Sequence, residues 1–199
     1  KEIADIRTGY SFRSKLEPDT KGNILVVQLK ELSDKNRVDI STAVKIYMHN
    51  ISDNYFLRKN DLVFRSRGID STAAIMDISS DNIILSAPFQ RIRLRDTSKI
   101  IPEYLLWYIN CKEAQAYFAA NKTGSSLVMI STAVLANLPV VIPSLEIKKK
   151  IIEINYLSER EIELQEELIK KKKMLTETLL LKTLELQLGE KYGKRNSEN

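Results

Sequence analysis

The chain has 199 residues, of which 43% are hydrophobic and 29% are charged, and its formal net charge is +5. This length and composition predict one globular domain of about 140 residues followed by a further segment, and they exclude wholesale disorder. The single cysteine, Cys111, excludes an intrachain disulfide framework and a zinc site built from several thiolates. No apolar run reaches the length of a membrane-spanning helix and no signal peptide is recognisable, so we expect a soluble, cytoplasmic protein.

Short apolar runs separated by turn residues predict strands in the first half of the chain. Residues 1–20 predict an entry strand followed by a loop, and the β-branched run 24–29 predicts a buried strand. Residues 41–60 are expected to be irregular. Further strands are expected within residues 60–68, 73–78 and 83–87, with a turn at 79–82 between the last two.

The segment 89–95 alternates between two kinds of side chain, as a strand does. One face carries Gln90, Ile92 and Leu94, and the other carries Arg91, Arg93 and Arg95. The arginine face is typical of a stripe that contacts phosphates, because guanidinium groups supply paired charge-assisted donors. It is equally typical of a solvated edge strand whose charges prevent further strand pairing. The sequence leaves both interpretations open.

A helix is predicted from Pro102, since proline suits the first turn. Its aromatic residues, including Tyr104 and Phe118, recur at helical spacing, which favours a place in the core over a platform for stacked bases. Beyond a polar loop at 122–126, Ser131 is expected to cap a short helix, and residues 140–142 to form a brief strand.

The segment after Pro143 predicts one very long helix. Ser144 is a good N-cap, strong helix formers follow without interruption, and Gly189 is expected to end the helix. Because such a helix greatly exceeds the size of a globular core, it needs another helix to pack against. The predicted organisation is therefore a globular domain over 1–143, a long helix over 144–188 and a disordered tail over 189–199. The expected fold class is α+β, a mixed domain with a twisted β-sheet followed by a helix that forms an antiparallel coiled coil.

An interrupted apolar seam runs along this helix. Polar residues such as Glu161, Lys172 and Lys182 break it, so a perfect leucine zipper is excluded, although polar seam positions can fix the register of pairing. The residues predicted to form the dimer contact are Ile147, Ile151, Ile154, Leu164, Leu168, Leu175 and Leu179.

The charges of the helix predict the direction of pairing. Five glutamates lie within 159–167, and four lysines follow at 170–173. Two parallel copies would set the lysine block against itself, whereas two antiparallel copies crossing near Leu168 place each acidic block against the lysines of the other chain. We therefore expect an antiparallel pair. The alternative is a solvated charge run on a single long helix.

Residues that carry catalytic chemistry are scarce in this sequence. His49 is the only histidine and no cysteine or acidic cluster accompanies it, so no metal site is expected. No glycine-rich phosphate loop and no Gly-x-Ser-x-Gly elbow occurs. Cys111 falls inside the aromatic helix, where a buried thiol is the simpler interpretation. We therefore expect no catalytic residue and no enzyme activity in this chain.

Several stretches, taken in order, resemble the specificity (S) subunit of type I restriction-modification systems. The most characteristic is the junction Ile142-Pro143-Ser144-Leu145 before the long Glu/Lys/Leu helix, and Lys148 departs from the family, which often has Gln there. The other matching stretches are Asp5-Ile6 with Gly9 and Ser11-Phe12, Asn60 to Phe64 with Arg67-Gly68, Ile101 to Leu105, Gly124-Ser125 with Ile130-Ser131, and Leu135 to Val140.

The resemblance implies a DNA-recognition role in a half-length form, with one target-recognition domain and one helix. Two copies would form a homodimer that reads an interrupted palindrome in double-stranded DNA. The chemistry would belong to a methyltransferase (M) subunit that uses S-adenosylmethionine, and to a possible restriction (R) subunit that uses ATP and Mg²⁺. The resemblance implies no cofactor in this chain.

For such a role, basic and polar residues are the candidates for DNA contact. Guanidinium and ammonium groups would bind phosphates, and hydroxyls would reach base edges or phosphates. The candidates are Arg13, Arg65, Arg67, Arg91, Arg93, Lys122, Ser125 and Ser126. Two other interpretations stay open: a recognition fragment of a fused restriction-modification enzyme, and a coiled-coil adaptor that binds only protein.

Overall fold

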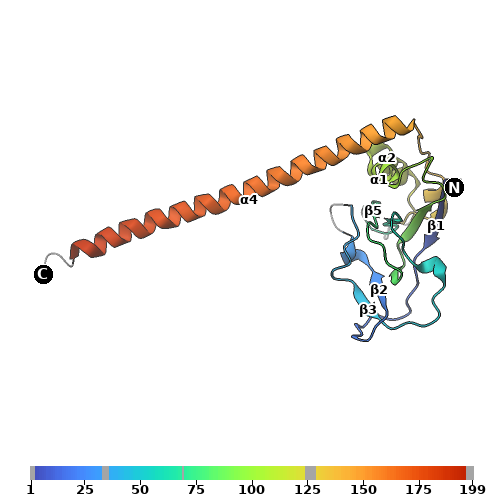
Figure 1. Cartoon of the computed structure of the whole chain (residues 1–199), viewed down its shortest axis with the longest axis horizontal. Coiled ribbons are helices and arrows are strands. Elements are labelled where there is room, and N and C mark those ends of the chain that lie inside the picture. The colour runs from blue at the N-terminus through green and yellow to red at the C-terminus, as the bar shows by residue number, and fades with distance from the viewer. Residues whose placement is uncertain (1–2, 33–35, 69, 124–128, 196–199) are drawn as a thin grey trace. The chain divides into compact units, whose positions relative to one another are not determined.

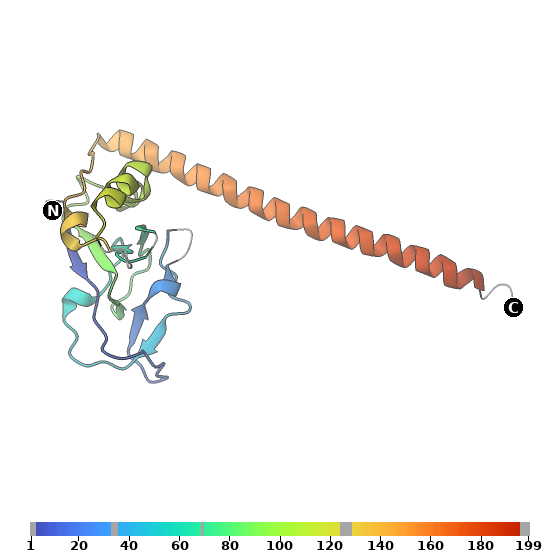
Figure 2. The same cartoon turned by 180° about the vertical axis from the view of Figure 1, so that it is seen from behind.

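The computed structural model describes residues 3–32, 36–68, 70–123 and 129–195, with side chains described as far as residue 185. Its contacts divide the chain into two units, Lys1–Ile152 and Glu153–Asn199. The first unit is a mixed domain of strands and short helices, and the second is entirely helical where it is described (Figures 1 and 2). The predicted α+β class with a long C-terminal helix is therefore confirmed.

Four strands form the first sheet, in the order β1-β7-β4-β5, and all neighbours are antiparallel. They are β1 (Ala4–Thr8), β7 (Gln90–Leu94), β4 (Leu62–Phe64) and β5 (Ala73–Ile75). Strand β7 lies between β1 and β4, so it is an interior strand. The interpretation of segment 89–95 as a solvated edge is therefore wrong, because β1 from the start of the chain pairs with it.

The second sheet has the order β3-β2-β6, with β2 parallel to β6 and antiparallel to β3. Its strands are β2 (Ile24–Val27), β3 (Val44–Ile46) and β6 (Ile83–Leu85). β3 lies within the segment expected to be irregular, which also contains the short 3-10 helix η2 (Asp53–Tyr55), and another short 3-10 helix, η1 (Leu29–Glu31), follows β2. β5 and β6 belong to different sheets, so the turn between them does not close a hairpin.

The alternating side chains of the first sheet contact two separate cores. Leu62 and Phe64 face the helices α1 (Pro102–Asn110), α2 (Lys112–Asn121) and α3 (Thr132–Ala136), where Tyr104 and Phe118 are also buried. The aromatic residues therefore belong to the core, as predicted, although the helix from Pro102 is interrupted at Cys111. Val63, on the other face of the sheet, joins a cluster with Val27 and Leu85 of the second sheet.

A third apolar cluster covers the far side of the second sheet. Ile24, Val26 and Ile84 are buried there against Tyr10 and Phe56. In the C-terminal part of the domain, Ser131 caps α3 by accepting a hydrogen bond from the Val134 amide, 3.2 Å away, as predicted. The brief strand expected at residues 140–142 does not form, and this segment runs as irregular chain into α4.

The outer edge of β5 is covered by groups from outside the sheet. The side-chain amide of Asn110, at the end of α1, accepts from the Ala73 amide (2.8 Å) and donates to the Ala73 carbonyl (3.0 Å). Further along, the Ile75 amide donates to the Asn36 carbonyl and the Val38 amide donates to the Ile75 carbonyl. Both hydrogen-bonding positions on this edge are therefore taken up within the domain.

The long helix α4 (Leu145–Arg195) begins as predicted, with the Ile147 amide donating to the Ser144 hydroxyl. Its first turns belong to the domain: Lys148 is buried and donates to the Lys99 carbonyl, and Ile151 packs on the first core. The expected stop at Gly189 is wrong. A helical glycine costs only about 1 kcal/mol, which a long run of helix-forming residues can outweigh.

The helix therefore continues through residues 189–195, which were expected to be a disordered tail, and residues 196–199 lie outside the described part of the chain. Its 51 residues correspond to a helix roughly 76 Å long. No helix in the described ranges combines the length and the hydrophobicity that a bilayer crossing requires.

Candidate nucleic-acid interface

The arginines of β7 are bound inside the domain. Arg91 is 3% exposed, and its Nη2 donates to the Asp5 carboxylate at 2.6 Å. Arg93 forms a two-point contact with Asp61, with distances of 2.7 and 2.6 Å. Burial lowers the pKa of Arg91, and the nearby positive charge of Arg93 lowers it further. The hydrogen bond with Asp61 raises the pKa of Arg93. Neither guanidinium offers DNA the open phosphate-facing stripe that the alternation suggested.

Arg91 is also incompletely satisfied. Its Nε and Nη1 atoms are buried and have no hydrogen-bond partner among the described residues. A buried charge with unsatisfied donors contributes little net stability, because desolvation offsets the ion pair. Arg65 is half-buried and makes one long contact, 3.4 Å, with the Leu32 carbonyl. Arg65 is therefore also poorly placed to contact DNA.

Two other candidate arginines are exposed and unpaired. Within the described residues, Arg13 and Arg67 have no hydrogen bond or ion pair from their side chains. By contrast, Arg7 contacts Asp5, and Arg58 contacts Asp53 at 2.7 Å. Carboxylates of the domain pair with several of its other arginines, so the unpaired guanidiniums of Arg13 and Arg67 mark a surface that is open to an anionic partner.

Arg67 and Arg13 line two adjoining hollows that share Ser11. The first, which we call the Arg67 hollow, lies between the end of β1 and the segments 66–67, 87–90 and 129–132. The second, the Arg13 groove, lies between segments 10–17 and 46–48 and includes Lys15 and Tyr47. The two hollows meet at Ser11 and each has a cation in its lining, and we refer to them together as the concave surface.

Backbone pairing holds Arg67 at its place in this surface. Arg67 forms a single antiparallel bridge with Met129, and the Ile130 amide donates to the Ser66 carbonyl at 2.8 Å. Gly68 follows with a φ of +115°, so the chain turns away directly after Arg67 in a conformation that glycine favours.

The same pairing brings Lys122 near this surface. Thr123 exchanges two backbone hydrogen bonds with Met129, at 3.1 and 3.0 Å, and Lys122 precedes it as an exposed side chain. Lys122 therefore lies next to the segment that pairs with Met129, but it does not line either hollow. The other two candidates of this loop, Ser125 and Ser126, lie outside the described residues.

Gly9 fixes the entry to the Arg13 groove. A Cβ atom at this position would lie 2.5 Å from the Leu85 carbonyl oxygen, which is closer than real contacts allow. The Gly9 amide donates to Phe89 and the Tyr10 amide donates to Leu85, so the chain crosses from the first sheet to the second at this point. The sequence shows no periodic signal for Ser11, Lys15 or Tyr47, because these residues lie outside the strand segments that a pattern identifies.

The helical unit exposes a second surface, which is formed by apolar side chains of α4. Seam residues Leu168, Leu175 and Leu179 are 52%, 60% and 55% exposed. Ile147, Ile154 and Leu164 are also exposed, whereas Ile151 is partly buried against the domain. The side chains that were predicted to form the helix contact are therefore mostly open.

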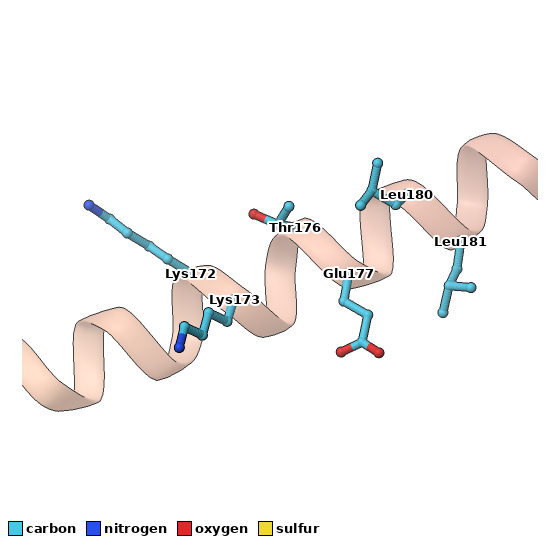
Figure 3. A pocket seen from close by; sticks show the side chains of 6 residues that line it. All are labelled: Lys172, Lys173, Thr176, Glu177, Leu180 and Leu181. Atoms are coloured by element: carbon cyan, nitrogen blue, oxygen red, sulfur yellow. The ribbon is translucent and has the colours of Figure 1, made fainter.

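The C-terminal half of the helix carries a groove between two rows of side chains. Figure 3 shows Lys172, Thr176 and Leu180 in one row, and Lys173, Glu177 and Leu181 in the next. Leu180 and Leu181 are exposed although they lie off the predicted seam. The apolar surface is therefore broader in this half than the seam alone suggested.

Charged residues brace the helix internally. Glu167 contacts Lys171 at 2.8 Å, and this hydrogen bond lowers the pKa of Glu167 and raises that of Lys171. Elsewhere, the described residues contain no group of three His, Cys, Asp or Glu side chains that could hold a metal ion.

The match to a family model gives this geometry a context. The model described as the type I restriction modification DNA specificity domain matches residues 1–174. The chain belongs to this family. The resemblance seen in the sequence is thereby confirmed, and residues 1–174 correspond to a DNA specificity domain. No curated protein matches the chain.

Three solved structures share the fold of this specificity domain. The type I restriction-modification S subunit from M. genitalium has 14% sequence identity with this chain and a TM-score of 0.52. The HsdS subunit from Thermoanaerobacter tengcongensis has 16% sequence identity and a TM-score of 0.56. A third structure, from work on the structural basis of complex assembly and conformational transition of the type I R-M system, has 16% sequence identity and a TM-score of 0.52. Each alignment covers 81% of this chain but only 38%, 36% and 37% of the respective structures.

Proposed function

We propose that this specificity domain reads one half of an interrupted palindromic DNA site and works as an antiparallel homodimer through α4. The observation that carries the DNA-binding part is the concave surface with the unpaired guanidiniums of Arg13 and Arg67. A free guanidinium beside hydroxyl groups suits both phosphate oxygens and base edges. Lys122, which is exposed and precedes the segment paired with Met129, is a further candidate for a phosphate contact beside this surface.

The reaction itself is assigned to partners. We expect a methyltransferase subunit that uses S-adenosylmethionine to extrude and methylate an adenine. A restriction subunit that uses ATP and Mg²⁺ would join where cleavage occurs. This chain would place these partners on the correct sequence, and its own residues would bind DNA and the second copy.

The exposed seam of α4 supports the homodimer. Leu168, Leu175 and Leu179 together expose an apolar surface that is unusual for an isolated helix in water. Antiparallel pairing about Leu168 would cover these side chains and place the glutamates of 159–167 against the lysines of 170–173. Two domains at opposite ends of such a pair would read two half-sites in inverted orientation, which an interrupted palindrome provides.

Cysteine crosslinking tests the direction of the helices. In a Cys111→Ser background, we expect Glu161→Cys in one copy to form a disulfide with Leu175→Cys in the other, because the two positions are equidistant from Leu168. A mixture of the two single variants should give the crosslinked dimer under mild oxidation, whereas Glu161→Cys alone should remain largely uncrosslinked. Efficient crosslinking of Glu161→Cys with itself would show parallel pairing and contradict the proposal.

A comparison of DNA methylation in cells with and without this gene tests the whole function. Loss of adenine methylation at one interrupted palindrome is the expected result. Loss at an asymmetric motif would show that this domain pairs with a different partner, as a fragment of a larger recognition protein would. A protein that binds no duplex even at low salt would contradict DNA recognition and favour an adaptor that binds only protein.

A further inference from the structure

We propose that Arg67 reads a guanine in the major groove and determines specificity, whereas Arg13 and Lys15 bind phosphates irrespective of sequence. This division of roles rests on the proposed DNA-binding function. It concerns the two adjoining parts of the concave surface, which share Ser11 but differ in the chemistry of their side chains.

The composition of the Arg67 hollow is that of a base-reading surface. Arg67 is the only charged side chain among the described residues that line it. Thr8, Ser11 and Thr132 supply hydroxyls, which donate to or accept from any base edge, and Met129 supplies an apolar contact of the kind that a thymine methyl group prefers. A site for phosphate alone would instead gather several cations, since affinity for the backbone grows with their number.

The Arg13 groove is richer in charge, since Arg13, Lys15 and the acidic Glu17 all line it. Arg13 and Lys15 lie two positions apart on an exposed segment, and Tyr47, 53% exposed, lines the same groove. Lysine is a compact charge without the flat fork of arginine, so it binds phosphate well and distinguishes bases poorly. Neither Arg13 nor Lys15 is held by a described side chain, which suits contact with a uniform backbone.

The backbone around Arg67 is fixed more firmly than that around Arg13. The buried Ser66 donates its hydroxyl to the Pro88 carbonyl, and the Ile130 amide donates to the Ser66 carbonyl. The buried side chain of Gln90 donates to the Ile130 carbonyl at 3.0 Å, which links these segments to β7. Contacts that specify a base require such a rigid support, because bidentate hydrogen bonds tolerate little displacement.

The guanidinium of Arg67 has no competing partner in the described part of the chain. Its donors are therefore available to a guanine, which presents the O6 and N7 acceptors at the spacing of the guanidinium fork. A good contact of this kind distinguishes the correct base by about ten- to a hundredfold. Arg67→Lys retains the charge but removes the fork, so it separates reading of a base from attraction to phosphate.

Selection from a pool of duplexes with randomised positions tests the proposal on the full chain. The wild type should enrich a motif that contains a guanine in each half-site. Arg67→Ala should lose the preference at that guanine by about ten- to a hundredfold. Arg67→Lys should weaken the same preference to a smaller extent because it lacks the guanidinium fork, and both variants should keep the preferences at the other positions. Arg58→Ala is the matched control, because it removes the same charge from the segment that precedes β4, whereas Arg67 follows that strand.

The possible outcomes separate the inference from the function on which it rests. An unchanged motif with uniformly weaker binding in Arg67→Ala would show that Arg67 binds phosphate and would overturn the assignment. If the wild type enriches no motif and retains no duplex, DNA recognition itself fails. Circular dichroism of each variant shows whether the domain is still folded, and the charge-preserving Arg67→Lys provides a second, milder change at the same position.

Discussion

The arginines of β7 and those of the concave surface show how one residue type takes opposite roles in one domain. Arg91 and Arg93 contact the carboxylates of Asp5 and Asp61 inside the domain. Arg13 and Arg67 have no such contact in the described residues, although the sequence grouped all four arginines as candidates for DNA contact. The difference lies in which distant acidic residue the topology brings close.

The difference also teaches where a charge contributes to stability and where it contributes to function. A paired, buried arginine is needed to neutralise its carboxylate, and removing one partner leaves the other charge unsatisfied. An unpaired, exposed arginine adds little to stability, so its charge matters only when an anion binds. Variants on the two sides of this contrast should therefore affect different measurements.

Asp61→Ala should give the largest effect, a loss of about 3 kcal/mol in the free energy of unfolding. The change leaves Arg93 without its two-point partner in a mostly buried position, and breaking such a pair is strongly destabilising. It also removes the acceptor of the Arg58 amide, 2.7 Å away. Urea unfolding followed by the fluorescence of Trp107 measures the loss, because this only tryptophan lies in the domain.

Asp53→Ala is the control for this variant. Asp53 is highly exposed and its contact with Arg58 lies on the surface, so the change should stay within about 0.5 kcal/mol of the wild type. If Asp61→Ala were equally mild, the internal pairing of β7 would not be what holds these arginines.

Arg13→Ala should weaken DNA binding without altering stability. We expect a lower affinity for duplexes of every sequence, and a slope of log affinity against log salt that is less steep by about 1, as for the loss of one phosphate contact. Fluorescence anisotropy over about 50 to 200 mM salt measures both quantities. An unchanged slope would place Arg13 outside the DNA contact.

Arg91→Met should change the free energy of unfolding by no more than about 1 kcal/mol. Methionine fills a similar volume without burying unsatisfied donors, and Asp5 keeps its contact with Arg7 at 2.9 Å. DNA affinity should also stay unchanged, because Arg91 is buried. A fall in affinity like that of Arg13→Ala would restore Arg91 to the DNA-binding set and break the contrast between the two regions.

The sequence predicted the periodic parts of the molecule well. The alternation around Ile92, the aromatic spacing from Tyr104 and the cap at Ser144 each report a local property, and the corresponding elements form. The predicted end of α4 at Gly189 is wrong, because the free-energy cost of one helical glycine is small compared with the gain from the helix-forming residues around it.

The contacts between distant segments were not predictable in the same way. Nothing near Arg91 indicates that Asp5 will lie beside it, since that pair forms only when β1 joins β7. β3 was missed because three residues are too few to show a period. The Arg67 hollow likewise combines four segments, so only the folded chain separates Arg67 from the buried basic residues that the sequence grouped with it.

The groups that cover β5 decide whether this edge of the first sheet can pair with a strand of another molecule. An uncovered edge strand offers its amide and carbonyl groups to any other strand, which is a common start of aggregation. Here Asn110 occupies the Ala73 position and residues 36–38 occupy the Ile75 position. The β5 edge therefore offers no free backbone groups to a strand of another molecule, so sheet growth cannot begin from this side of the first sheet.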